Sequence, residues 1–103
     1  MTRKIITTRK AKLLVEDKYN IDKNTCEMVI WELPKKTAER PHGFKYRLYY
    51  GNEKGNCLLR YDNEQGKGDH IHHGRHEQKY TFVSVEQLIK DFFYDIKKIN
   101  DKT

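Results

Sequence analysis

Four of the five histidines in this chain fall within one short segment, which is its most distinctive chemical feature. The segment reads Gly66-Lys-Gly-Asp-His-Ile-His-His-Gly-Arg-His76. Imidazole titrates near neutral pH, so a pair of histidines can supply both the base and the acid of phosphodiester cleavage without a metal. The glycines let the backbone come close to a ligand and aim its N–H groups at an anion. The segment is therefore the strongest candidate for a catalytic site, and no cofactor is expected.

Within this segment we expect His70 and His72 to transfer protons, with Asp69 beside them. Cations would hold the phosphate and stabilise charge in the transition state, and tyrosines would stack on bases. Together these residue types predict RNA cleavage through the 2′-hydroxyl. The residues expected to bind nucleic acid flank the segment or share one face of a predicted sheet: Arg60, Lys67, Arg75, Lys45 and Arg47.

The same histidines allow a second chemical interpretation, which is a metal site. On a strand, His70 and His72 would point both rings to one side, and His76 or Asp69 would complete the ligand set. No standard zinc spacing surrounds the pair, so the sequence favours a site without metal. A purely structural interpretation also stays open, in which loop histidines such as His73 and His76 bond to backbone carbonyls.

The elements that must position this segment begin with a predicted hairpin. From Phe44 to Tyr50 the residues alternate between two faces of a strand,. One face carries Phe44, Tyr46, Leu48 and Tyr50, and the other carries Lys45, Arg47 and Tyr49. After a turn at residues 51–56, the segment Cys57 to Asp62 is a second strand. Arg60 and Asp62 could form an ion pair, and Asn63 could satisfy turn amides.

Further strands are predicted from Lys12 to Glu16, from Cys26 to Leu33 and from Lys79 to Val83, with residues 18–25 connecting the first two. Ser84-Val-Glu-Gln87 has the form of a capping box, and the apolar residues after it recur at helical spacing,. The predicted fold is α+β, an antiparallel β-meander of about five strands packed by a C-terminal α-helix. We expect one domain over residues 1–103, with flexible ends at residues 1–10 and 100–103.

Charge and cysteine usage narrow the class of protein. The formal net charge of +6 and the pI of about 9.3 favour an anionic partner such as nucleic acid or an acidic protein,. Cys26 and Cys57 are too far apart in the sequence for a C-x-x-C pair, which argues against a zinc knuckle or a disulfide framework,. No signal peptide or membrane span is visible, so a cytoplasmic protein is expected.

The stretch Arg60-Tyr-Asp-Asn-Glu-Gln-Gly-Lys-Gly-Asp-His-Ile-His72 resembles the TumE family, toxins of prokaryotic toxin–antitoxin modules. The likeness covers most of the chain from Lys10 to Ile96. Three further stretches carry it: Trp31-Glu-Leu-Pro34, Phe44-Lys-Tyr-Arg-Leu48 and Thr81-Phe-Val-Ser-Val-Glu-Gln-Leu-Ile-Lys-Asp-Phe92.

The resemblance implies a growth-inhibiting toxin that is neutralised by an antitoxin with a helix-turn-helix domain, encoded next to it. It does not imply an active site. The first hypothesis is therefore a metal-independent endoribonuclease toxin acting on RNA. The second is a non-enzymatic module whose basic sheet face docks on nucleic acid or an acidic protein. The sequence leaves open a homo-oligomer, in which a sheet edge or a tyrosine cluster would be buried.

Overall fold

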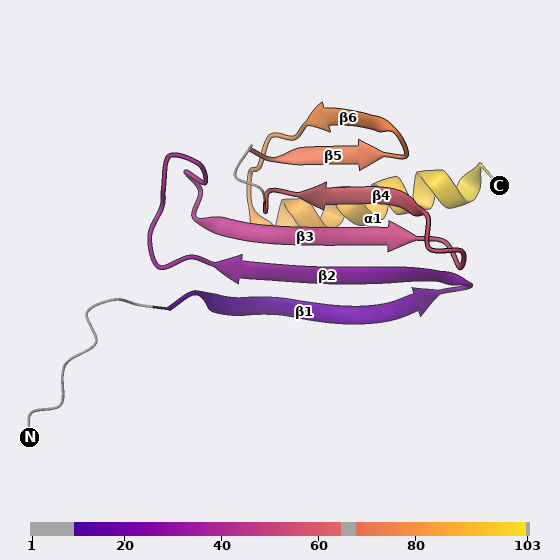
Figure 1. Cartoon of the computed structure of the whole chain (residues 1–103), viewed down its shortest axis with the longest axis horizontal. Coiled ribbons are helices and arrows are strands. Elements are labelled where there is room, and N and C mark those ends of the chain that lie inside the picture. Colours follow the sequence, from indigo (N-terminus) through magenta and orange to yellow (C-terminus); the bar gives the residue numbers. More distant parts are fainter. Residues whose placement is uncertain (1–9, 65–67, 103) are drawn as a thin grey trace, which may run out of the picture.

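The computed structural model describes residues 10–64 and 68–102. Six antiparallel strands form one sheet in the order in which they occur in the chain, and one helix follows them (Figure 1). The α+β meander closed by a C-terminal helix is thus confirmed, with six strands instead of about five. The elements are β1 (Lys12–Ile21), β2 (Asn24–Glu32), β3 (Phe44–Gly51), β4 (Cys57–Asp62), β5 (His70–His73), β6 (His76–Lys79) and α1 (Val85–Asp101).

The hydrophobic core lies between one face of the sheet and the helix. Alternation along the central strands supplies it, because every second side chain of a strand points to the same face. On β3 these are Tyr46, Leu48 and Tyr50, as predicted, and all three are fully buried. The helix contributes Leu88, Phe92 and Ile96, and the remaining buried side chains come from the neighbouring strands: Cys26, Met28, Ile30, Leu59, Tyr61 and Ile71.

The helix begins where the capping residues predicted it. The Ser84 hydroxyl accepts a hydrogen bond of 3.0 Å from the backbone N–H of Gln87, which satisfies one of the free donors of the first turn,. Figure 1 shows α1 crossing behind β3 and β4, so it covers one face of the sheet and leaves the other open. The predicted flexible ends fall partly outside the described residues (1–9 and 103), and α1 continues to Asp101.

Tyrosine hydroxyls join the sheet to the helix through carboxylates. The Tyr61 hydroxyl donates to Asp95 at 2.5 Å, and the Tyr80 hydroxyl donates to Asp91 at 2.6 Å. Burial, followed by these hydrogen bonds, raises the pKa of both phenols well above the ordinary value,. The polar ends of large aromatic side chains are therefore satisfied inside the interface between the two layers.

Three boundary predictions were wrong. β1 continues to Ile21 and turns tightly at Asp22, which has a positive φ of 55°, so residues 18–25 are mostly strand. The segment from Lys79 to Val83 is not a strand beyond its first residue, because Tyr80 and Phe82 leave the sheet and pack against the core. The histidine segment is not a loop: its described part forms the hairpin of β5 and β6.

Candidate active site on the open face of the sheet

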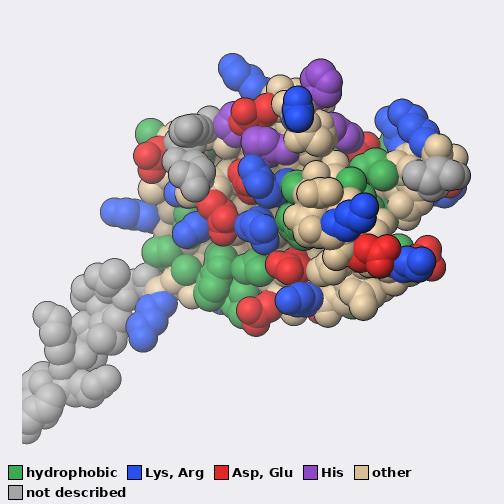
Figure 2. All heavy atoms as spheres, turned by 45° about the vertical axis from the view of Figure 1, so that its right-hand side comes forward, with side chains coloured by type: hydrophobic (Ala, Val, Ile, Leu, Met, Phe, Trp, Pro, Cys, Tyr) green, Lys and Arg blue, Asp and Glu red, His purple; other side chains and the backbone are tan. Residues whose placement is uncertain are grey.

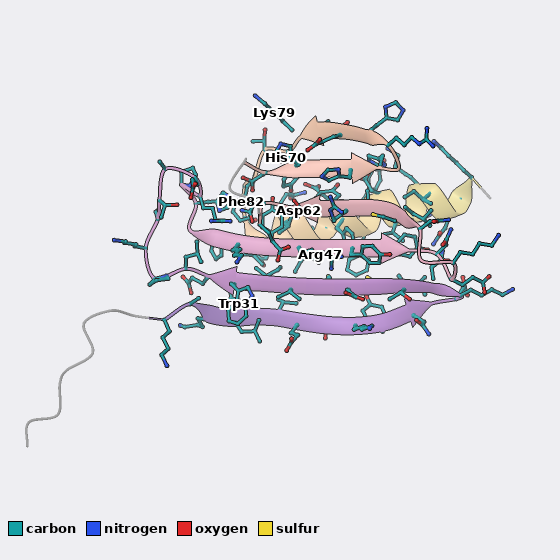
Figure 3. All side chains as sticks on the ribbon, in the orientation of Figure 1. Trp31, Arg47, Asp62, His70, Lys79 and Phe82 are labelled. Atoms are coloured by element: carbon teal, nitrogen blue, oxygen red, sulfur yellow. The ribbon has the colours of Figure 1, made fainter. Side chains whose placement is uncertain are left out.

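The open face of the sheet carries a hollow of about 370 Å³ formed by four adjacent strands and the segment between β4 and β5. Figure 2 shows histidine, basic and acidic side chains gathered on the upper part of the molecule. Figure 3 shows Arg47, Asp62 and His70 rising from neighbouring strands. We call this the histidine hollow, and its lining residues are Arg47, Arg60, Asp62, Glu64, Gly68, His70, His72 and Glu77.

Strand register brings the two predicted proton-transfer residues into this hollow. His72 lies directly opposite Arg60 on β4 and opposite Glu77 on β6. His70 lies opposite Asp62 on β4. Because directly paired residues of antiparallel strands share a face, all of these side chains project to the open side. The ring centroids of His70 and His72 are 6.4 Å apart.

The Glu77 carboxylate lies between the two imidazoles. Its Oε2 atom is 3.7 Å from Nε2 of His70 and 3.6 Å from Nε2 of His72. Both rings are largely buried, whereas the Glu77 side chain is about half exposed. A carboxylate at nearly equal distance from both rings is placed to attract the positive charge that either ring acquires when it accepts a proton.

Arg60 is held in the hollow by an acidic neighbour on its own strand. Its Nε atom lies 2.5 Å from Oδ2 of Asp62. A guanidinium has five N–H donors, so this contact leaves the terminal nitrogens of Arg60 able to bind another anion. The Arg47 guanidinium already has two partners. Its Nη1 atom lies 3.4 Å from Glu27, and the guanidinium stacks 4.9 Å above the ring of Tyr49.

Asp69 turns away from this hollow, although it immediately precedes His70. Its carboxylate accepts hydrogen bonds from the Tyr46 hydroxyl at 2.6 Å and from Nε2 of His42 at 2.9 Å. His42 must donate through Nε2, because its Nδ1 accepts the backbone N–H of Phe44,. The ring of His42 also stacks on Phe82 at 4.0 Å. Both ring nitrogens and the carboxylate are therefore occupied by contacts within the fold.

A family model compared with the whole sequence decides the class of this protein. The model described as "Toxin TumE" matches residues 3–100. The chain belongs to the TumE toxin family. It is the toxin component of a toxin–antitoxin system, and membership of this family implies an antitoxin partner. No curated protein and no solved structure gives a significant match.

Other residues singled out by the sequence lie outside the histidine hollow of this TumE toxin. His73 projects toward the helix, with Nε2 at 3.6 Å from Asp95. Arg75 and His76 are exposed at the tip of the β5–β6 hairpin. Lys45 shares the open face but pairs with Trp31, one pair along from Arg47 on that face. Lys67 lies outside the described residues.

The Tyr-Asp-Asn stretch divides its roles between the two faces. Asp62 faces the histidine hollow, whereas Asn63 is fully buried and braces the end of β3. The Asn63 side chain accepts the backbone N–H of Tyr46 at 2.9 Å and donates to the carbonyl of Phe44 at 2.8 Å. Arg40 adds a clamp, because its guanidinium donates to the carbonyls of Asn63 and of the next residue. The structural interpretation of Asn63 is thus confirmed.

Sequence reasoning missed Glu77 and Lys79, which lie opposite His72 and His70 on β6. They were not predicted because the segment was interpreted as a loop. A loop, unlike a hairpin, does not define which residues lie opposite His70 and His72. The alternating His70-Ile71-His72 and Gly74, whose φ is +57°, were the available signals for a hairpin,. Ile71 is buried on the face opposite the histidines.

The metal interpretation required a third ligand beside His70 and His72. The structure places the two candidates elsewhere, with Asp69 bonded to Tyr46 and His76 exposed at the hairpin tip. Across residues 10–64 and 68–102, no three histidine, cysteine, aspartate or glutamate side chains are grouped so as to hold a metal ion.

No described helix is both long and apolar enough to cross a membrane.

Proposed function

We propose that this toxin is a cytoplasmic, metal-independent endoribonuclease that cleaves RNA in the histidine hollow. The observation that carries the proposal is the placement of His70 and His72 on one face of the sheet, 6.4 Å apart and beside Arg60. Each imidazole nitrogen needs to come within about 2.6–3.2 Å of the oxygen whose proton it exchanges. Two rings at this separation can therefore reach the attacking and leaving oxygens of one phosphate.

The proposed reaction is an internal transfer at phosphorus. One imidazole accepts the proton of the 2′-hydroxyl while that oxygen bonds to phosphorus. The bond from phosphorus to the 5′ oxygen breaks, and the second imidazole, protonated at the start, gives its proton to that oxygen. The products are a 2′,3′-cyclic phosphate and a 5′-hydroxyl end. The terminal nitrogens of Arg60 bind the phosphate oxygens, on which negative charge increases.

In our proposal, the acidic residues Asp62 and Glu77 stabilise the positive charges of the site. Asp62 forms an ion pair with Arg60 at 2.5 Å and keeps the cation in the hollow, so a phosphate meets a positive charge that is already in place,. The Glu77 carboxylate stabilises the positive charge on whichever ring carries a proton, at 3.6 Å from one ring and 3.7 Å from the other,. Lys79, opposite His70, adds a positive charge at the rim. Lys67, Lys45, Arg47 and Arg75 remain candidates for binding RNA farther from the cleaved bond.

The decisive experiment incubates purified toxin with mixed cellular RNA in the presence of excess EDTA. We expect fragments that carry 2′,3′-cyclic phosphate ends, and we expect His70→Ala and His72→Ala each to remove cleavage and growth inhibition. His76→Ala is the matched control, because this histidine is exposed outside the hollow. Cleavage that disappears with EDTA and returns with one metal would replace the acid–base mechanism by a metal-dependent one.

A toxin that inhibits growth without cutting RNA would instead be a binding module acting through its open face. Full toxicity of both His70→Ala and His72→Ala would favour that function and would remove the histidines from the mechanism. Binding to RNA should weaken steeply with salt if phosphates are contacted, because each neutralised phosphate releases counterions. We further propose that the antitoxin carries a helix-turn-helix DNA-binding domain.

A further inference from the structure

A second hollow, also of about 370 Å³, lies at the start of β1 and has a different charge balance. Four lysines surround it, with one glutamate, and the floor is formed by small and apolar residues. We call it the lysine hollow, and its lining residues are Lys10, Lys12, Glu32, Leu33, Pro34, Lys35, Lys36, His42 and Gly43. In the described part of the chain, none of the four lysines takes part in an ion pair.

The histidine hollow differs in this respect, because its arginines already have acidic partners. Arg60 is paired with Asp62, and Arg47 is paired with Glu27. Unpaired ammonium groups around a concave surface give a positive potential that an anionic partner can neutralise. The lysine hollow is therefore the more open to an acidic ligand.

The loop that carries half of these lysines has a fixed backbone. The N–H of Leu33 donates to the carbonyl of Gly43 at 2.8 Å, and the N–H of Gly43 donates to the carbonyl of Arg40 at 2.9 Å. Gly43 has a φ of +84°, and a Cβ there would lie 3.3 Å from the side chain of Lys36. Lys35 and Lys36 are thus presented by a closed loop, which lowers the entropy cost of binding a partner.

Beside this hollow, β1 offers exposed apolar side chains and an edge. Leu13, Leu14 and Tyr19 are 40%, 41% and 42% exposed, although all three lie on one strand. A register shift between Leu13 and Val15 marks an irregularity in the pairing with β2 at this point,. Figure 1 shows that the helix crosses behind β3 and β4 and not behind β1. Among the described strands, β1 pairs with β2 alone. The backbone N–H and C=O groups on its other edge are therefore available to pair with an added strand.

We infer that β1 and the lysine hollow together are the docking surface for the antitoxin. The occupant is an extended antitoxin segment that adds to the sheet along β1, places apolar side chains on Leu13 and Leu14, and sends acidic side chains into the lysine hollow. Such strand addition takes affinity from backbone hydrogen bonds and specificity from alternate side chains. The inference rests on membership of the TumE family and not on the proposed ribonuclease activity.

This surface is remote from the two proton-transfer histidines on β5. β1 and β5 are separated by three strands in the sheet, so at about 4.8 Å per strand they are roughly 19 Å apart. The anchor of the antitoxin and the toxic site can consequently be altered independently of one another. Substitutions in the lysine hollow should leave toxicity in place while releasing it from neutralisation.

The test measures binding of the full-length toxin to the antitoxin encoded beside it. The toxin variant Lys10→Gln/Lys12→Gln/Lys35→Gln/Lys36→Gln should associate about tenfold more slowly at low salt and lose most of the salt dependence of wild-type binding. The control, Lys23→Gln/Lys54→Gln/Lys90→Gln/Lys102→Gln, removes the same charge from exposed lysines outside the hollow. It should bind like the wild type. Circular dichroism checks that both variants are folded.

Hydrogen exchange of the complex supplies the second readout. Backbone amides of β1 should gain protection when the antitoxin binds, and His70→Ala should bind it with unchanged affinity. The inference is overturned if the two lysine variants bind equally well, if both are weakened equally, or if protection appears over the histidine hollow instead of β1. Dimerisation of the toxin alone through β1 would assign the edge to a second copy of this chain and would also overturn it.

Discussion

Asp69 and His70 are neighbours in the chain, yet their side chains lie on opposite faces of the sheet. The carboxylate of Asp69 binds Tyr46 and His42 on the helix side, whereas His70 lines the histidine hollow on the open side. The alternation of a strand separates them, because successive side chains point to opposite faces. Substitutions at the two positions should therefore have different consequences.

Asp69→Ala should destabilise the fold. The Asp69 side chain is 11% exposed, and its Oδ2 atom accepts two hydrogen bonds that alanine cannot replace. Leaving buried donors poorly satisfied costs about 1–3 kcal/mol each, so the midpoint of urea unfolding should fall. His70→Ala is the matched control and should shift the midpoint little, since its ring makes no hydrogen bond within the core. Equal midpoints for the two variants would contradict this division.

Glu77→Gln should lower the rate of RNA cleavage without abolishing it. The amide keeps the size of the side chain but loses the charge that lies 3.6 and 3.7 Å from the two imidazoles. Loss should be smaller than the about 10²–10⁴-fold that removal of an acid–base residue costs. The informative measurement separates binding from cleavage: the single-turnover rate should fall while the affinity for RNA stays unchanged. A rate equal to that of the wild type would remove Glu77 from the mechanism.

Asn63→Ala should be among the most destabilising single substitutions at a polar position. It leaves the backbone N–H of Tyr46 and the carbonyl of Phe44 buried without their side-chain partner. The expected loss is about 2–6 kcal/mol, from two unsatisfied groups at about 1–3 kcal/mol each. Chemical denaturation measures it, with Asn56→Ala as an exposed asparagine control. If Asn63→Ala loses no more stability than Asn56→Ala, water must satisfy the N–H of Tyr46 and the carbonyl of Phe44 in place of the side chain.

Stability should fall steeply at alkaline pH. Burial, strengthened by hydrogen bonds to carboxylates, raises the pKa of Tyr46 and Tyr61 well above the value of about 10 that a phenol has in the unfolded chain,. Their stabilising contribution is therefore complete below pH 10 and is lost as the pH rises above it. Each phenol of this kind adds a slope of about 1.4 kcal/mol per pH unit. Urea titrations between pH 8 and 11 test this.

Tyr46→Phe should reduce the slope by about 1.4 kcal/mol per pH unit, the share of one phenol, even though it lowers stability at neutral pH by removing the bond to Asp69. Tyr94→Phe is a control, because Tyr94 is 63% exposed. If wild-type stability stays level up to pH 11, the raised pKa values are refuted.

Strong local patterns made part of this fold predictable from sequence. The strand from Phe44 and the helix after Ser84 follow from alternation and from a capping residue, which depend on near neighbours in the chain. The end of the sheet was mispredicted because Tyr80 and Phe82 alternate like strand residues, although packing against the core, and not pairing with another strand, buries them. Alternation of apolar residues indicates that a face of the segment is buried, but it does not show whether strand pairing or packing against the core buries it.

The candidate site was predictable only in its residue types. His70, His72 and Arg60 were anticipated together, because an H-x-H pair on a strand shares a face. The departure of Asp69 from the site depends on His42, which comes from a distant loop. The role of Glu77 depends on a hairpin whose four-residue strands are polar and histidine-rich. The hairpin had a local signal in Gly74 and the alternation before it, whereas the contact between Asp69 and His42 joins distant segments, and no local signal in the sequence predicts it.

The order of the sheet also bears on how the protein is made. Each strand pairs with the strand next to it in the chain, so the sheet can assemble as a series of successive hairpins during synthesis, without waiting for distant segments. The helix that covers the core follows all six strands. A ribosome-bound chain from which α1 has not yet emerged would thus expose the apolar face of its sheet, and it would gain a closed core only after α1 has emerged and packed against that face.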